Sequence, residues 1–186
     1  MISSDLKTMQ SIEVLRDFDE KTFTEIMGVI KAAYADGMDA GDESYIRGKL
    51  ENEKNINVIF RHGDRVVGYL MATPHNDAYE ELKDDDPLLV EDAERYYVNF
   101  VQILPEYRKG RGLLKMVGKM FDEAREQFGS NKFSWHCRTV NGLSSVIQRF
   151  FKGMPRTVRH IESWKYTKNE PYDYIEATHY KRAGKV

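Results

Sequence analysis

A chain of 186 residues is long enough for one domain with a sizeable core, and two domains are not expected. Hydrophobic residues make up 41% and charged residues 31%, which is typical of a soluble globular protein, and the longest apolar runs are far short of a membrane span. The formal net charge of −2 argues against a dedicated nucleic-acid binder, for which a basic domain is expected. The single cysteine, Cys137, excludes an internal disulfide and any cysteine-rich metal site.

The first ten residues, MISSDLKTMQ, are polar and include an acid, unlike the basic and then apolar layout of a signal peptide. We therefore expect a cytoplasmic protein with neither a membrane nor a nucleic-acid partner. Residues 1–186 are expected to form a single domain, with flexible ends at residues 1–10 and 181–186.

The N-terminal part is predicted to contain one strand and two helices. Isoleucine and valine alternate with charged residues over residues 11–18, which predicts a short first strand. Asp17 or Asp19 can cap the helix that follows, and Gly37 can end it. The buried face of that helix would be formed by apolar residues at helical spacing, namely Phe23, Ile26, Met27, Ile30 and Tyr34. A second helix is expected from about residue 42 to residue 53.

A hairpin and a long acidic connection follow. Residues 57–61 and 65–73 are rich in strand-forming residues, and the glycine in the turn between them favours a hairpin. Gly68 within the second strand predicts a bulge or a close backbone approach. Residues 75–95 are acidic, with Asp84-Asp85-Asp86-Pro87 at their centre. We interpret this segment as a solvated connection; the alternative is a recognition surface for a basic substrate.

The stretch from Tyr96 to Phe128 contains the main functional signal. Residues 96–104 favour a strand, which Pro105 ends. The basic, glycine-containing turn 108–112 is followed by apolar residues at helical intervals, Leu113, Met116, Val117, Met120, Phe121, Ala124 and Phe128. A strand, such a turn and a helix together present free backbone N–H groups and the positive end of a helix to an anion. The sequence therefore predicts a phosphate or pyrophosphate site at the start of this helix.

The C-terminal part is predicted to add three strands and a short helix. Residues 132–138 favour a strand, and residues 143–151 a helix that ends at Gly153. Residues 157–167 and 172–180 are aromatic-rich strands joined by the turn 168–171.

The histidines and the cysteine do not suggest a metal site. His136 and Cys137 are neighbours on a strand and point to opposite faces, so they cannot pair with each other. Cys137 is expected to be a small, buried side chain that fills space in the core. For His136 a packed position is expected, with a position facing a cleft as the alternative. The five histidines lack HxH or HExxH spacing, so no metal is expected.

Two stretches resemble conserved regions of the GNAT superfamily of N-acetyltransferases. The first, ILPEYRKGRGLLKMV, resembles the acyl-CoA-binding signature V-x-P-x-[YW]-[RQ]-x-x-G-x-[GA]. The second, NGLSSVIQRFFKGM, resembles the region N-x-x-[SA]-x-x-x-[YF]-x-K-x-G-F. The predicted order β-α-α-β-β-β-α-β-α-β-β is also that of the superfamily. The resemblance implies an α/β (α+β) fold with a central mixed, mostly antiparallel sheet of about seven strands flanked by about four helices.

The resemblance implies acetyl-CoA as cosubstrate and no metal. In this superfamily the strand end binds pantetheine through its backbone, the amides of the turn hold the pyrophosphate, and the second region flanks the far side of the CoA arm. The resemblance assigns cofactor binding to the following residues: Val101, Gln102, Ile103, Arg108, Lys109, Gly110, Arg111, Gly112, Leu113, Leu114, Asn141, Ser145 and Lys152. The turn carries one extra residue, so either Arg108 or Lys109 fills the basic position, and Leu114 replaces a small residue.

Three residues are candidates for catalysis, Glu94, Tyr97 and Asn99. Tyr97 and Asn99 share one strand face, and Asn99 is a polar residue among apolar neighbours, which favours a place in a cleft over a satisfied core amide. Glu94 is the best carboxylate for a base, with a solvated loop residue as the alternative. Many members have a tyrosine near the position of Phe150 and Phe151, which acts as the acid that protonates the CoA thiolate. In this chain either Tyr97 or Ser145 would act as that acid, or the thiolate leaves without being protonated.

The expected activity is transfer of an acetyl group from acetyl-CoA to a primary amine of a small molecule, by direct attack in a ternary complex. The alternatives are an acetyltransferase for protein lysines or N-termini and a non-catalytic acyl-CoA sensor. The acceptor, the acyl length and the oligomeric state, including a homodimer, stay open.

Overall fold

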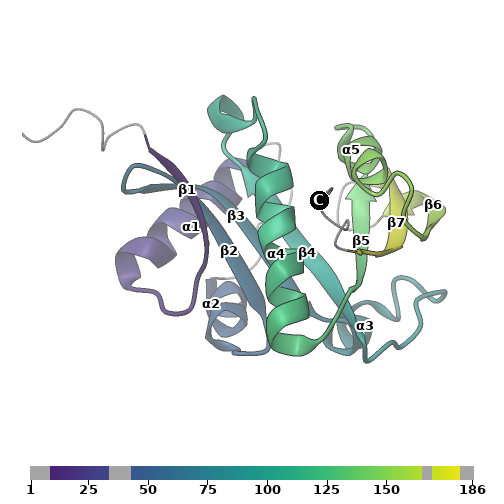
Figure 1. Cartoon of the computed structure of the whole chain (residues 1–186). Helices are drawn as coiled ribbons and strands as arrows, with labels where there is room; N and C mark the ends of the chain where they lie inside the picture. The colour runs from purple at the N-terminus through teal and green to yellow at the C-terminus, as the bar shows by residue number, and fades with distance from the viewer. Residues whose placement is uncertain (1–8, 34–42, 165–168, 181–186) are drawn as a thin grey trace, which may run out of the picture. The chain divides into compact units, whose positions relative to one another are not determined.

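A computed structural model describes residues 9–33, 43–164 and 169–180 (Figure 1). In chain order the elements are β1 (Gln10–Val14), α1 (Glu20–Ala33), α2 (Glu43–Glu51), β2 (Ile56–His62), β3 (Arg65–Pro74), α3 (His75–Leu82), β4 (Arg95–Ile103), the 3-10 turn η2 (Pro105–Tyr107), α4 (Gly112–Phe128), β5 (Lys132–Arg138), α5 (Leu143–Phe150), β6 (Arg156–Trp164) and β7 (Glu170–Thr178).

The strands hydrogen-bond in the order β1-β2-β3-β4-β5-β7-β6. β1 with β2, β2 with β3, β5 with β7 and β6 with β7 are antiparallel, whereas β4 and β5 are parallel. This confirms the predicted mixed, mostly antiparallel seven-stranded sheet. The described part of the chain has five α-helices where about four were expected, and the additional one is α3.

Two compact units make up the chain. Unit 1 comprises Met1–Thr73 and Asn99–Glu123, and unit 2 comprises Pro74–Val98 and Ala124–Val186. The chain passes from one unit to the other at the last residue of β3, within β4 and within α4. That residues 1–186 form a single domain stays a prediction.

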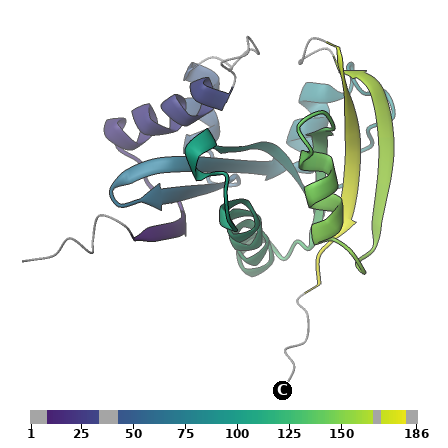
Figure 2. The ribbon, with the colours of Figure 1, turned by 90° about the horizontal axis from the view of Figure 1, so that it is seen from above.

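In unit 1, α1 and α2 cover one face of β1–β3, and the first part of α4 covers the other (Figures 1 and 2). The predicted apolar stripe of α4 is confirmed at its centre, where Met116, Val117, Met120 and Phe121 are almost fully buried. It is wrong for Phe128, which is 39% exposed at the end of the helix. Asp19, one of the two predicted caps, begins α1 by accepting a hydrogen bond from the Thr22 N–H at 2.7 Å. The apolar faces of α1, α2 and α4 thus close the core of this unit over the strands.

Phe60 of β2 is packed tightly beneath the turn that leads into α4. A Cβ atom placed on Gly112 would lie 2.8 Å from Cε1 of Phe60, closer than two carbon atoms approach. A Cβ on Gly68 would lie 3.2 Å from Cβ of Phe60 and from the Gln102 carbonyl oxygen. The strand register also shifts between Phe60 and Arg61, opposite Gly68. Both alternatives predicted for Gly68, a bulge and a close approach, are therefore present together.

In unit 2, helices α3 and α5 lie on opposite faces of the strands. Tyr97 is paired with Ser134 across β4 and β5, so both point to one face, and Trp135 points to the other. Phe151, at the end of α5, packs edge-on against Trp135 with ring centroids 5.5 Å apart. On the opposite face, Ala78 of α3 forms a buried cluster with Leu89, Tyr97 and Tyr174.

Several predicted boundaries are wrong. The first strand ends at Val14 rather than residue 18, because residues 16–17 form a bend. The second helix ends at Glu51 rather than at residue 53. The expected solvated connection over residues 75–95 instead begins with α3, and Asp86 at its acidic centre is only 3% exposed. Tyr34, Gly37, residues 165–167 of the predicted strand 157–167 and residue 168 of the predicted turn 168–171 lie outside the described residues.

We expect Gly112→Ala to destabilise the chain, because its methyl group would displace the buried Phe60 ring or shift α4. Overpacking of this kind costs about 1–3 kcal/mol of unfolding free energy. Gly118→Ala is the matched control on the same helix, since no atom lies within 4 Å of its added Cβ. That control should gain about 0.5–1 kcal/mol from helix propensity. Urea denaturation measures both, and equal effects of the two substitutions would contradict the packing argument.

Candidate active site

The turn before α4 leaves backbone donors without partners inside the helix. Gly110 has φ of +113°, a conformation that side-chain-bearing residues rarely adopt. The helix begins at Gly112, and its first hydrogen bond runs from the Lys115 N–H to the Arg111 carbonyl at 2.9 Å. The N–H groups of Gly112, Leu113 and Leu114 precede that bond and have no acceptor within the helix.

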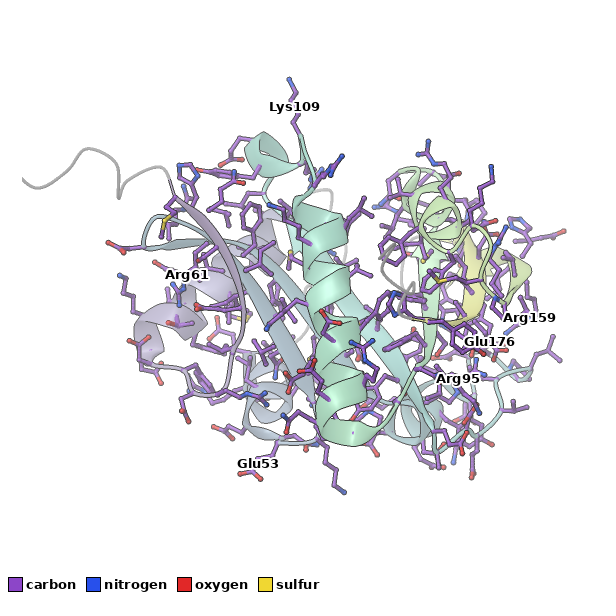
Figure 3. All side chains as sticks on the ribbon, viewed as in Figure 1. Glu53, Arg61, Arg95, Lys109, Arg159 and Glu176 are labelled. Carbon is purple, nitrogen blue, oxygen red and sulfur yellow. The ribbon has the colours of Figure 1, made fainter. Side chains whose placement is uncertain are left out.

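The charge around this helix start is positive. The first turn of α4 contains no acidic residue. Lys109 and Arg111 are exposed, and Figure 3 shows Lys109 extending away from the ribbon. Arg108 folds back instead, and its Nε donates to the Ile103 carbonyl at 2.9 Å. Leu114 is 37% exposed and therefore lies at the surface of the helix.

The last residues of β4 have backbone groups that point to two sides. The Leu104 N–H donates to the Val67 carbonyl on β3 at 2.9 Å. Because these directions alternate along a strand, the polar groups of Gln102 also face β3, and those of Val101 and Ile103 face the opposite edge. On that edge the Ile103 carbonyl accepts the bond from Arg108. Val101 and Ile103 are therefore placed to pair with an extended group that runs along β4.

Asn99 carries a buried polar atom with no hydrogen-bond partner in the part of the chain that the structure describes. Its Oδ1 atom is inaccessible, although the residue as a whole is half-buried. An unsatisfied buried oxygen costs free energy unless a ligand or water supplies a donor.

The predicted residues of the second region belong to unit 2 and flank or form α5. The Asn141 Oδ1 atom accepts from the Leu143 N–H at 3.0 Å, next to Gly142 with φ of +75°. Ser145 and Lys152 are exposed, whereas the neighbouring Ser144 is buried and donates to Asp173 at 2.5 Å.

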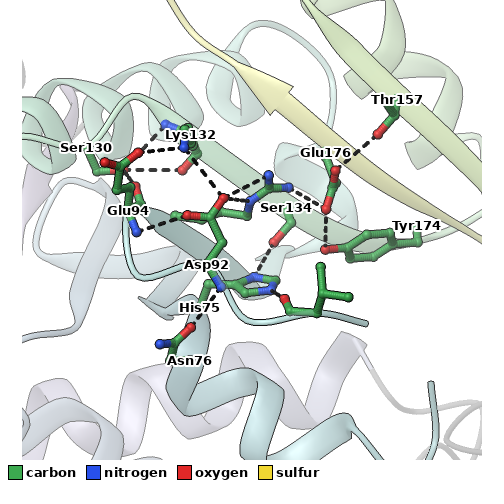
Figure 4. Close-up of polar contacts among 12 residues, drawn as sticks. His75, Asn76, Asp92, Glu94, Ser130, Lys132, Ser134, Thr157, Tyr174 and Glu176 are labelled. Carbon is green, nitrogen blue, oxygen red and sulfur yellow. Dashed lines mark hydrogen bonds and ion pairs between the residues drawn. The ribbon is translucent and has the colours of Figure 1, made fainter. Parts of the chain in front are cut away.

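Glu94 lies just before β4 in an exposed ion pair. Its carboxylate is 2.6 Å from Lys132 Nζ, and its side chain is 76% exposed (Figure 4). Its backbone carbonyl accepts a bond from the Ser130 hydroxyl at 2.6 Å. The role of base predicted for Glu94 stays a prediction.

Tyr97 belongs to a buried chain of polar side chains that sequence reasoning missed. Its hydroxyl lies 2.8 Å from Nδ1 of His136, and Nε2 of the same ring lies 3.0 Å from Oδ2 of Asp86. Arg159 contacts the same Asp86 oxygen at 2.5 Å. The side chains of His136 and Asp86 are 2% and 3% exposed, and Arg159 is about 29% exposed. The expected packed position of His136 is thus confirmed.

The charges in this chain follow from burial and pairing. Burial acts to raise the pKa of Asp86, but hydrogen bonds from His136 and Arg159 outweigh it and hold that pKa at about 2. Burial lowers the pKa of His136, despite the opposing effect of Asp86. At neutral pH Asp86 is therefore a carboxylate and His136 a neutral imidazole, whose Nε2 donates to Asp86 and whose Nδ1 accepts from Tyr97.

A second polar network anchors the segment between α3 and β4 (Figure 4). His75 contacts the Ser134 hydroxyl and the Val90 carbonyl, both at 2.9 Å. Arg95 lies 3.1 Å from Asp92 and 2.6 Å from Glu176. These contacts explain why the acidic segment packs on the sheet instead of being solvated.

The described residues offer no cluster of metal ligands and no accessible thiol. Cys137 is fully buried, and burial raises the pKa of its thiol well above the usual range. Among the residues described, no three or more His, Cys, Asp or Glu side chains gather as metal ligands. None of the helices in the described ranges combines the length and apolarity needed to cross a membrane.

Comparison with known proteins defines the fold. No family model and no curated protein matches the sequence. Among solved structures, the ribosomal-protein-S18-alanine N-acetyltransferase from Escherichia coli matches with a TM-score of 0.64 and 13% identity, over 95% of this chain and 97% of that one. An aminoglycoside 6'-N-acetyltransferase complexed with coenzyme A matches with a TM-score of 0.66 and 10% identity, over 92% and 98%.

NAA60 from Arabidopsis thaliana, in complex with acetyl-CoA, matches with a TM-score of 0.59 and 10% identity, over 92% of this chain and 98% of that one. Together with the strand order, these likenesses establish that the chain has the fold of the GNAT acetyltransferases, as its two sequence motifs predict.

We expect acid to destabilise the chain through Asp86 and His136. The pKa of Asp86 is lower when folded than its ordinary 3.8, so its contribution is complete above pH 4 and is lost as the pH falls towards 2. The pKa of His136 is also lower when folded than its ordinary 6.5, so the free energy of unfolding falls further as the pH drops below 6.5. Asp86→Asn should cost about 2 kcal/mol at neutral pH, and this difference should shrink below pH 4.

The measurement is urea denaturation of both proteins at neutral and acid pH. Asp84→Asn removes an exposed acid two residues away and should change stability by less than about 0.5 kcal/mol. A cost for Asp86→Asn that is the same at pH 7 and pH 3 would exclude the charge as its cause.

Proposed function

We propose that this protein is a cytoplasmic N-acetyltransferase that transfers an acetyl group from acetyl-CoA to a primary amine of a small molecule. The observation that carries the proposal is the start of α4. There, free amides follow a glycine-shaped turn, with Lys109 and Arg111 exposed beside them and no acid in the first turn of the helix. Such an arrangement suits a pyrophosphate.

The residues at this site fit the parts of acetyl-CoA in order. The amides of Gly112, Leu113 and Leu114 would hold the pyrophosphate, and Lys109 and Arg111 would neutralise it. The pantetheine arm would pair with the free edge of Val101 and Ile103. Arg108 would act indirectly, by fixing the Ile103 carbonyl through the bond it already makes. Asn141, Ser145 and Lys152 stay predictions for the far side of the CoA arm.

Acetyl-CoA supplies a thioester whose carbonyl carbon an amine attacks. A C–N bond forms, the C–S bond breaks, CoA leaves as a thiolate, and the nitrogen gives its proton to a base. A backbone N–H near Val101 would stabilise the oxyanion. Asn99 stays a prediction for catalysis, and its buried Oδ1 atom lacks a partner among the described residues.

Glu94 as the base and Tyr97 as the acid stay predictions. Glu94 is exposed and engaged with Lys132, whereas Tyr97 is buried and linked to a neutral imidazole. Holding both substrates in one complex would supply much of the rate.

Isothermal titration with acetyl-CoA tests the cofactor site. The double variant Lys109→Ala/Arg111→Ala should bind about tenfold or more weakly, since each cation contributes roughly 1 kcal/mol near an anion. Lys119→Ala removes an exposed cation further along the same helix and should leave binding unchanged. Equal losses in both variants, or no heat with the unmodified chain, would refute this site.

Thiol release from acetyl-CoA across a panel of acceptors tests the activity. We expect turnover with small primary amines and none with peptides that offer a lysine or a free N-terminus. Turnover with peptides alone would favour a protein acetyltransferase. Binding without thiol release for any acceptor would indicate an acyl-CoA sensor.

A further inference from the structure

A cavity of about 280 Å³ lies in unit 1, where the start of α1 meets the β2–β3 hairpin. Its walls are formed by Asp19, Lys21, Thr22, Arg61 and Asp64. The volume is close to the lower end of the ~300–1,000 Å³ that is typical of sites for small molecules. None of these five residues is among those assigned to acetyl-CoA or to catalysis, so the cavity is not part of the site proposed for the cofactor.

Arg61 is a fixed cation in the wall of this cavity (Figure 3). Its Nε donates to Glu13 at 3.0 Å, its Nη1 donates to the Asp64 carbonyl at 3.2 Å, and a Glu25 oxygen lies 3.7 Å from Nη1. The Arg61 side chain is only 21% exposed. The guanidinium group is therefore held in one position before a ligand arrives and needs little ordering on binding.

Asp19 and Thr22 form a second fixed part of the wall. The Thr22 N–H donates to Oδ1 of Asp19 at 2.7 Å, and the Thr22 hydroxyl lies 3.5 Å from Nη2 of Arg61. Thr22 is 8% exposed, so this side of the cavity is packed into the protein. The carboxylate of Asp19 thus has a defined place beside the guanidinium group.

Lys21 and Asp64 bring opposite charges to the cavity and do not pair with each other. Both side chains are exposed. Among the residues that the structure describes, neither the Lys21 ammonium nor the Asp64 carboxylate has a hydrogen-bond or ion-pair partner. A small cavity with an unpaired cation and an unpaired anion is complementary to a ligand that carries both charges close together.

We propose that this cavity binds a free amino acid, with the carboxylate of the ligand on Lys21 and its α-ammonium group on Asp64. Arg61 extends the positive part of the wall and Asp19 the negative part. Hydrogen bonds between charged groups are roughly twice as strong as neutral ones, so the two ends of the ligand would carry most of the affinity. The proposal goes beyond acetyl transfer and does not depend on it, because the two sites share no residue.

The groups behind the wall favour an amino acid with a basic side chain. Glu13 and Glu25 both contact Arg61 and offset its charge. Asp19 and Asp64 then outweigh Lys21, and the potential in the cavity is negative. Among ligands with the same zwitterionic end, we therefore expect lysine to bind more tightly than alanine, and alanine more tightly than glutamate.

Amide NMR titration of the labelled chain without acetyl-CoA tests the site. Alanine at millimolar concentration should shift the amide signals of Thr22, Arg61 and Asp64. Two blocked analogues separate the charges, since alaninamide lacks the carboxylate and N-acetylalanine lacks the ammonium group. Each should bind about tenfold or more weakly than alanine, because each leaves one charged wall group unpaired.

Substitutions on the surface of the cavity test the two contacts separately. Lys21→Ala and Asp64→Asn should each weaken alanine binding about tenfold or more. In Lys21→Ala the advantage of alanine over alaninamide should disappear, because the partner of the carboxylate is gone. Lys31→Ala, an exposed lysine further along α1, and Asp122→Asn, an exposed acid on α4, are the matched controls and should leave binding unchanged.

Three results would overturn the amino acid site. These are an absence of amide shifts with alanine and with lysine, equal binding of alanine and its two blocked analogues, and equal losses in the cavity variants and their controls. Shifts that fall on β4 and the start of α4 instead would place the amino acid at the proposed site of acetyl transfer and would also refute this cavity. Failure of acetyl-CoA to bind would refute the proposed function and leave the amino acid site intact.

Discussion

The contact of Phe60 with Gly112 is the constraint on which the proposed cofactor site depends. It presses the first turn of α4 against a buried aromatic ring, at a distance that leaves no room for a side chain. Gly68 allows the same ring to fit against β3, beside Gln102 and Ile103. The helix start and the end of β4 are thus held by one packing cluster. Donors that are fixed before binding cost no ordering when an anion arrives, so this rigid packing would favour the proposed binding of a pyrophosphate.

Unit 2 depends on a different kind of constraint, a buried carboxylate. Asp86 is stable as an anion only because His136 and Arg159 both contact it, and these contacts draw the segment after α3 onto the sheet. The same contacts orient the imidazole towards Tyr97. One set of hydrogen bonds therefore holds the segment after α3 on the sheet and fixes the orientation of the imidazole.

Local patterns predicted the elements well, and long-range pairing limited the rest. The strand, the turn and the helix of residues 96–128 follow from Pro105, two glycines and a regular apolar stripe, all visible in sequence. Helix α3 was missed because its eight residues, HNDAYEEL, are mostly polar and bury only one side. The sequence predicts a solvated Asp86 because the partners of its carboxylate lie 50 and 73 residues away. In the same way, Gly112 was recognised as a motif glycine, but Phe60 as the reason for it is visible only in the fold.

The most direct measurement for the central claim is an amide NMR titration of the labelled protein with acetyl-CoA. The account predicts that the largest shifts fall on the backbone N–H groups of Gly110, Gly112, Leu113 and Leu114, with smaller ones at Val101 and Ile103. Shifts that leave these amides unchanged, or that gather elsewhere on the chain, would contradict it.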